Sequence, residues 1–112
     1  MYIMKSLKAE LHCHNIFSNG HVGSLEPIHD CSVTIPQQLE QAHLAGLDVL
    51  FVTNHNTIDG YRQMLEYKKN HQKFDTLSVY PAEEVTTNNE SHVLVYGIDH
   101  SIKSGLSLHE VL

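Results

Sequence analysis

The sequence predicts an α/β domain built around a mainly parallel sheet. Residues 47–53 (LDVLFVT) form an apolar run without alternation, as expected of a strand that is buried on both faces. Segments with helical spacing of apolar residues, 35–45 and 58–70, alternate along the chain with strand-like segments at 8–14, 47–53 and 77–85. This alternation is typical of parallel strands with helices packed outside the sheet.

The first strand-like segment, residues 8–14 (KAELHCH), alternates in side-chain character. Strict alternation places Leu11 and Cys13 on one side of the sheet and Glu10, His12 and His14 on the other. We expect Cys13 to point into the core as a small apolar residue. Residues 15–34 show no period, and a loop of about 20 residues is uncommon unless it has a function.

Both predicted helices have recognisable ends or apolar faces. Thr34 is a natural N-cap for the helix at 35–45, Pro36 fits its first turn, and Gly46 is a natural terminator. Helical spacing predicts the buried faces, which consist of Ile35, Leu39, Ala42 and Ala45 in the first helix and Ile58, Tyr61, Met64 and Leu65 in the second.

A fourth strand is predicted at 91–98, joined to the third by a link too short for a crossover helix. These two strands should therefore form a hairpin that turns at Asn88 and Asn89, which tolerate positive φ. A three-residue turn over 87–89 would place Glu84 directly opposite His92 on one face. A two-residue turn would place them on opposite faces.

The last residues, 107–112 (SLHEVL), open like a helix, because Ser107 and Glu110 have the spacing of a capping box. A helix of about one turn is not stable alone. We therefore expect residues 1–112 to form a single, apparently truncated domain, the front part of a larger α/β domain.

Composition excludes several classes of function. Seven basic against thirteen acidic residues give a net charge of −6, which argues against an extended nucleic-acid surface or an anionic membrane as partner. No run of about 18 apolar residues predicts a membrane span, and the N-terminus lacks the apolar core of a secretory signal. With only Cys13 and Cys31, a disulfide framework is excluded, and a cytoplasmic location is the simplest expectation.

Histidine is unusually frequent, with ten residues, and imidazole is the commonest metal ligand in proteins. The carboxyl ends of parallel strands gather ligands, and the chemistry-bearing residues fall at those ends or open the fourth strand: His12, His14, His55, Glu83, Glu84 and His92. Imidazole and carboxylate ligands suit zinc, manganese or iron, and one carboxylate can bridge two ions. Each residue also has an ordinary alternative, since an exposed histidine pair, a hydrogen-bonded loop histidine or a turn-capping glutamate needs no metal.

Four segments in order resemble the motifs of one family. ELHCHNIFSNG (10–20) is similar to a strand that ends in His-x-His before a tight turn, and LAGLDVLFVTNHNTIDGY (44–61) to a strand that ends in Thr-Asp-His. VYPAEEVTT (79–87) is similar to Pro-Gly-x-Glu with a following β-branched residue, and ESHVLVYGID (90–99) to a histidine that opens an apolar strand. These are the motifs of the PHP family, the polymerase and histidinol phosphatase domains, and the resemblance covers most of residues 8–99.

The resemblance implies a distorted (β/α) barrel with two or three divalent metal ions at one rim. It implies metal ligands at five positions, which are His12, His14, His55, Glu84 and His92, with Glu84 as the bridging carboxylate. Glu83 matches a variable position of the family and is expected to lie behind the ligands or at the surface.

Three positions depart from the family pattern, and one of them, Asn56, stands where relatives carry a further acidic residue. Asn19 stands where most relatives carry an acidic or histidine ligand, and asparagine is a poor ligand for these metals. Asn54 replaces the aspartate that usually precedes the second-motif histidine and supports it from behind. Candidates to fill the place of the missing ligand are His21, His29, Asp30 and Cys31, of which we favour His21 or Asp30. His21 is also a candidate general acid.

The resulting function hypothesis is a metal-dependent hydrolase of phosphate esters that acts on nucleotides, short nucleic acids or phosphorylated small molecules. The alternative is a non-catalytic scaffold or a metal-binding fragment that lacks the later ligands of the family. An open sheet also exposes an edge strand, so we expect homo-oligomers that associate through that edge.

Overall fold

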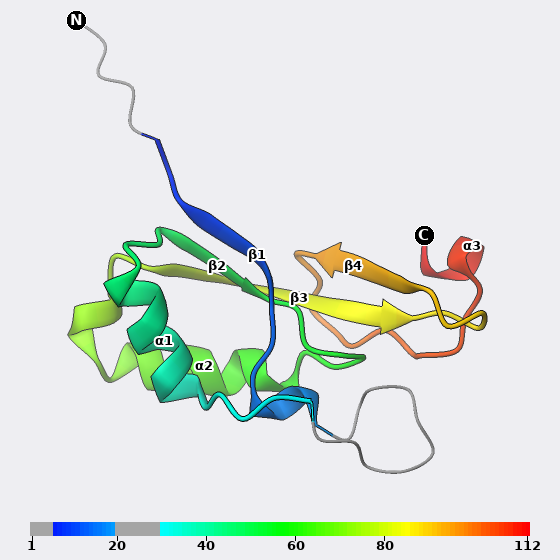
Figure 1. Cartoon of the computed structure of the whole chain (residues 1–112), viewed down its shortest axis with the longest axis horizontal. Helices are drawn as coiled ribbons and strands as arrows, with labels where there is room; N and C mark the ends of the chain where they lie inside the picture. The colour runs from blue at the N-terminus through cyan, green and yellow to red at the C-terminus, as the bar shows by residue number, and fades with distance from the viewer. Residues whose placement is uncertain (1–5, 20–29) are drawn as a thin grey trace, which may run out of the picture.

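The computed structural model describes residues 6–19 and 30–112 and shows a mixed α/β fold with one curled four-stranded sheet (Figure 1). His21 and His29, both named as candidates above, lie outside the described residues. In chain order the elements are β1 (Ala9–Cys13), the short 3-10 turn η1 (Ile16–Ser18), α1 (Ile35–Leu44), β2 (Val49–Val52), α2 (Asp59–Lys69), a second 3-10 turn η2 (Gln72–Phe74), β3 (Ser78–Thr86), β4 (His92–Tyr96) and α3 (Leu108–Val111).

The strands lie in the order β1-β2-β3-β4, with the first three parallel and β4 antiparallel to β3. The predicted parallel sheet with one hairpin is therefore confirmed. The sheet is curled enough for the hydroxyl of Tyr96 on β4 to donate a 2.7 Å hydrogen bond to the carbonyl of Leu11 on β1, across the two strands between them. Its concave face carries Phe51, which stacks on the ring of Tyr80 and meets the ring of Tyr96 edge to face.

The main core lies between the sheet and helices α1 and α2, which cover the same side of it (Figure 1). Its buried members are Ile35, Leu39, Ala42, Leu50, Val52, Met64, Phe74, Leu77 and Val79, with Cys13 packed against them as predicted. The predicted helix faces are confirmed except at Ala45, the C-cap residue of α1, and at Leu65, in the middle of α2, both of which are exposed. Thr34 caps α1 in a reciprocal pair with Gln37, which fixes where that helix begins.

The predicted strict alternation of the first strand is wrong, because β1 contains an irregularity. Its register pairs Glu10 with Leu50 and Cys13 with Val52, so three steps on β1 match two on β2. An extra residue of this kind re-aims the side chains that follow it. Glu10 therefore shares the side of Cys13 instead of that of His12.

Neither of the two hairpin registers considered from the sequence is present, although His92 lies on the face of Glu84, as the three-residue turn would give. His92 pairs with Thr86, and Glu84 pairs with Leu94, because the turn takes five residues, 87–91, instead of three. Within that turn the hydroxyl of Thr87 bonds Asn89, and Glu90 adopts a φ of 66°. Since Glu84 and Thr86 are two residues apart on β3, His92 still lies on the face of Glu84.

The C-terminal segment begins the predicted helix, α3, with the reciprocal capping of Ser107 and Glu110. Within the described ranges, we find no helix that is both long and apolar enough to cross a membrane.

Candidate metal centre

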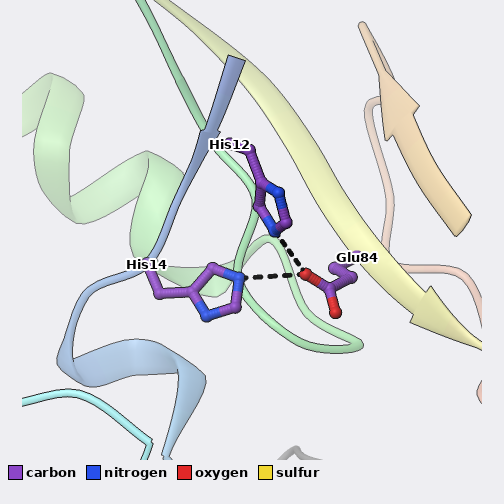
Figure 2. A group of neighbouring side chains, drawn as sticks. All are labelled: His12, His14 and Glu84. Atoms are coloured by element: carbon purple, nitrogen blue, oxygen red, sulfur yellow. Dashed lines mark hydrogen bonds and ion pairs between the residues drawn. The ribbon is translucent and has the colours of Figure 1, made fainter. Parts of the chain in front are cut away.

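Four imidazoles meet around one carboxylate at the carboxyl ends of β1, β2 and β3. The carboxylate is that of Glu84, which is buried on β3, and the rings are those of His12, His14, His55 and His92. Figure 2 shows His12 and His14 reaching from the end of β1 toward the same oxygen of Glu84. The register explains the meeting, since His55 forms an isolated parallel bridge with Glu84 beyond the end of β2.

Each oxygen of Glu84 faces its own pair of histidines. Oε1 lies 2.7 Å from Nε2 of His12 and 3.2 Å from Nε2 of His14. Oε2 lies 2.5 Å from Nδ1 of His92 and 3.5 Å from Nδ1 of His55. One carboxylate thus separates two donor sets, which is the arrangement of a bridging ligand between two metal ions.

A second carboxylate, that of Asp30, lies on the far side of two of these rings. Its Oδ2 is 2.7 Å from Nδ1 of His14, and its Oδ1 is 3.6 Å from Nε2 of His55. Within the described residues, three overlapping groups have ligand atoms within 4.8 Å of one another, namely His12–His14–Glu84, His14–Asp30–His55 and His55–Glu84–His92. The structure therefore brings six donor side chains into one continuous cluster.

Hydrogen bonds and nearby imidazoles keep the carboxylates of the cluster ionised despite their burial. Burial alone would raise the pKa of Glu84, but the hydrogen bond from His12 and the nearby imidazoles outweigh it and hold that pKa below its ordinary value. Burial lowers the pKa of His55, which favours the neutral ring that binds metals. The side chains of His12 and His92 are 56% and 45% exposed, whereas that of His55 is 7% exposed. The cluster is thus closed behind His55 and open to solvent at His12 and His92.

Two further observations indicate that these side chains suit a metal ion. The buried Nδ1 of His55 has no hydrogen-bond partner, although it faces Glu84, and buried polar atoms are rarely left unpaired. Imidazole nitrogen with carboxylate oxygen is also the donor chemistry of zinc and of related transition metals.

A network of buried amides fixes the chain next to these histidines. Asn54 and Asn15 exchange two 2.8 Å hydrogen bonds, one from the backbone N–H of Asn15 to Asn54 Oδ1 and one from Asn54 Nδ2 to Asn15 Oδ1. Asn15 also donates to Gln38, whose amide donates to the carbonyl of His14 at 3.0 Å. The residue after His14 and the residue before His55 are therefore tied to each other and to α1.

Hydrogen bonds with Ser18 and Asn56 fix the backbone positions of His55 and of the end of β3. The backbone N–H of His55 donates to the hydroxyl of Ser18 at 2.9 Å. Asn56, at a φ of 52°, accepts from the backbone N–H of Thr86 and donates to its hydroxyl. The end of β3 is thereby held against the segment that follows β2.

The remaining residues named from the sequence lie at the edge of the cluster or outside it. Both ends of the Asn19 amide bond the backbone, since Oδ1 accepts from Asp30 and Cys31, and Nδ2 donates to the carbonyl of Cys31. Cys13 packs into the core, where burial raises the pKa of its thiol to about 12. Glu83 points away from the cluster and accepts from the backbone N–H of Ile102.

Sequence reasoning missed the supporting side chains of Asn15, Ser18 and Gln38, all of which are buried. One signal for Gln38 was available, because it lies three residues after Ile35 and four before Ala42, on the apolar stripe of α1. A polar residue at such a position needs a buried partner.

An open groove of about 350 Å³ adjoins the cluster along β1 and α1. His12 and His14 line it together with Glu10, Cys13, Val33, Gln38, Gln41, Ala42, Leu47 and Leu50. Among the described residues, this lining contains one carboxylate and no lysine or arginine.

No protein-family model and no curated protein matches the chain. The resemblance to the PHP family therefore depends on the four sequence motifs, and the chemistry below is argued from the residues of this chain.

Proposed function

We propose that the chain is a metal-dependent hydrolase of phosphate esters with a centre of two divalent ions bridged by Glu84. The observation that carries the proposal is the division of four histidines between the two oxygens of that one carboxylate. Zinc, manganese and iron all suit these donors.

One ion would be held by His12, His14 and Glu84, and the other by His55, His92 and Glu84. Two ions bound there would polarise a phosphoryl oxygen and lower the pKa of a bound water enough to supply hydroxide near neutral pH. Glu84 contributes a negative charge, because the surrounding imidazoles hold its pKa low. The ordered network of Asn15, Asn54 and Gln38 fixes His14 and His55 before any ligand arrives.

The direction of substrate approach follows from exposure. His12 and His92 are the exposed members of the set, so the phosphate group enters on their side, while His55 and Glu84 form the closed wall. Because the described residues that line the adjoining groove include no lysine or arginine, the ions would match the charge of the phosphate. We expect the substrate to be a nucleotide, a short nucleic acid or a phosphorylated small molecule.

We further infer that the curled sheet is the first part of a distorted barrel of the PHP type. The strand order, the single hairpin and the position of the histidines at the carboxyl ends of the parallel strands support this inference.

The test is hydrolysis of p-nitrophenyl phosphate and bis(p-nitrophenyl) phosphate by chain loaded with zinc or manganese. We expect activity in the wild type and its loss in the variant His12→Ala/His14→Ala. The variant His100→Ala/His109→Ala is the matched control, because it also removes two histidines, both exposed and neither within the cluster. Tight metal binding without hydrolysis of either ester would reject the enzyme and favour the non-catalytic metal-binding alternative.

A further inference from the structure

Asp30 holds a position in the cluster that the motif resemblance does not assign. Its carboxylate meets His14 at Nδ1, while Glu84 meets the same ring at Nε2. His55 lies between the same two carboxylates, with Nε2 toward Asp30 and Nδ1 toward Glu84. The rings of His14 and His55 pack edge to face, with their centroids 4.6 Å apart.

A neutral imidazole offers one lone pair, so each ring gives one nitrogen to a metal and carries a proton on the other. Two ligand atoms on one tetrahedral zinc lie about 3.3 Å apart, given bonds of about 2.0–2.1 Å. At His14 the contact to Glu84, 3.2 Å, is close to this value. The contact to Asp30, 2.7 Å, is the shorter of the two at this ring and has the length of a charge-assisted hydrogen bond, as do the contacts of Glu84 to His12 and His92 before an ion binds.

The position of Asp30 is set by the turn that follows β1. The side-chain oxygen of Asn19 accepts from the backbone N–H groups of Asp30 and Cys31, and its amide donates to the carbonyl of Cys31. The hydroxyl of Ser18 bonds the carboxylate of Asp30. These contacts hold the carboxylate of Asp30 beside His14.

We propose that Asp30 is a positioning residue of the metal centre. Its carboxylate accepts a hydrogen bond from the Nδ1–H of His14 and so directs the unprotonated Nε2 of that ring to the ion at Glu84. Asn19 takes part by holding Asp30 in place. Carboxylates that orient a metal-bound histidine in this way fix its tautomer and raise its basicity. This inference depends on the metal centre of the proposed function. The opposing arrangement is Asp30 as a ligand itself, sharing an ion with Nδ1 of His14 and Nε2 of His55.

The deciding measurement is the tautomer of His14 in zinc-loaded chain, read from long-range ¹⁵N–¹H spectra of histidine-labelled protein. We expect a proton on Nδ1 and zinc on Nε2. Zinc on Nδ1 of His14 would overturn the role of Asp30 and leave the hydrolase proposal standing. If the expected tautomer is found but no phosphate ester is hydrolysed, the role of Asp30 stands and the hydrolase proposal is rejected. A chain that takes up no zinc would overturn both proposals.

Zinc affinity of substituted chains supplies the second readout. We expect Asp30→Ala to weaken zinc binding about 10- to 100-fold, and Asp30→Asn, which keeps an oxygen acceptor, to recover most of that loss. Equal losses in the two variants, with one ion fewer per chain, would show that Asp30 is a ligand. The control is Asp99→Ala, because Asp99 makes the same contact to Nδ1 of His100 at 2.6 Å on the exposed surface. Unchanged zinc affinity is expected there.

Discussion

The amide pair of Asn54 and Asn15 gives the sharpest prediction about how the fold supports the centre. Asn54 is 2% exposed and Asn15 is fully buried, and their two mutual hydrogen bonds are both 2.8 Å long. In Asn54→Ala the side-chain oxygen of Asn15 keeps a donor, the backbone N–H of Phe17. The backbone N–H of Asn15 loses its acceptor and stays buried.

The expected cost follows from these contacts. An orphaned buried donor costs about 1–3 kcal/mol, and the cavity left by the truncated side chain adds about 1 kcal/mol. We therefore expect a loss of about 2–4 kcal/mol in the free energy of unfolding. For a domain of this size about 4 °C of melting temperature corresponds to each kcal/mol. The assay is urea unfolding followed by circular dichroism.

Asn70→Ala is the matched control, because Asn70 is exposed and its side chain makes one hydrogen bond, to the carbonyl of Glu66 at the end of α2. Its expected cost is within about 0.5 kcal/mol. If Asn54→Ala were no more destabilising than Asn70→Ala, the buried network would not hold the segment next to His55, and the reasoning would be refuted.

Three further predictions concern other parts of the chain. Burial raises the pKa of Glu83, although the side chain accepts a hydrogen bond from the backbone N–H of Ile102. The folded chain therefore retains this proton above the ordinary pKa of a glutamate, and the free energy of unfolding falls as pH rises through the raised pKa. Glu83→Gln should remove this fall, and an unchanged pH dependence of the melting temperature in that variant would contradict the prediction. In Gly60→Ala the new Cβ would lie 2.9 Å from Cβ of Phe17. The cost of this overpacking, about 1–3 kcal/mol, should outweigh the gain in helix propensity, so the variant should be less stable than the wild type. Equal stability in urea would argue against this contact. Association through the sheet edge stays a prediction, which light scattering over a concentration series checks, and a strict monomer would rule it out.

The parallel strands and the hairpin of the sheet could be predicted, because they depend on local patterns. Apolar runs, helix caps at Thr34 and Ser107, and the short link after β3 each act over a few residues. The register of the hairpin could not be predicted, because its five-residue turn depends on the side-chain bond of Thr87 to Asn89 and on the positive φ of Glu90. Asn-Asn tolerates several turn lengths, so the residue types alone do not choose one.

Part of the candidate site could also be predicted from the sequence, and part could not. The histidines and Glu84 could be named from the sequence, because they stand at the ends of strands that a parallel sheet brings together. The sequence could not show which loop residue joins the cluster. Asp30 reaches His14 because Asn19 bonds the backbone of the loop at Asp30 and Cys31. Asn54, which the sequence suggested as a weakened support for His55, lies instead in the amide network.

The measurement that tests the metal centre most directly is the number of zinc ions bound per chain, by elemental mass spectrometry after equilibrium dialysis. A centre bridged by Glu84 predicts two ions in the wild type, one in His12→Ala/His14→Ala, and two in His100→Ala/His109→Ala. Glu84→Gln removes the charge that both ions share and should release both. A wild-type chain without zinc, or zinc that stays bound in Glu84→Gln, would contradict the proposed centre.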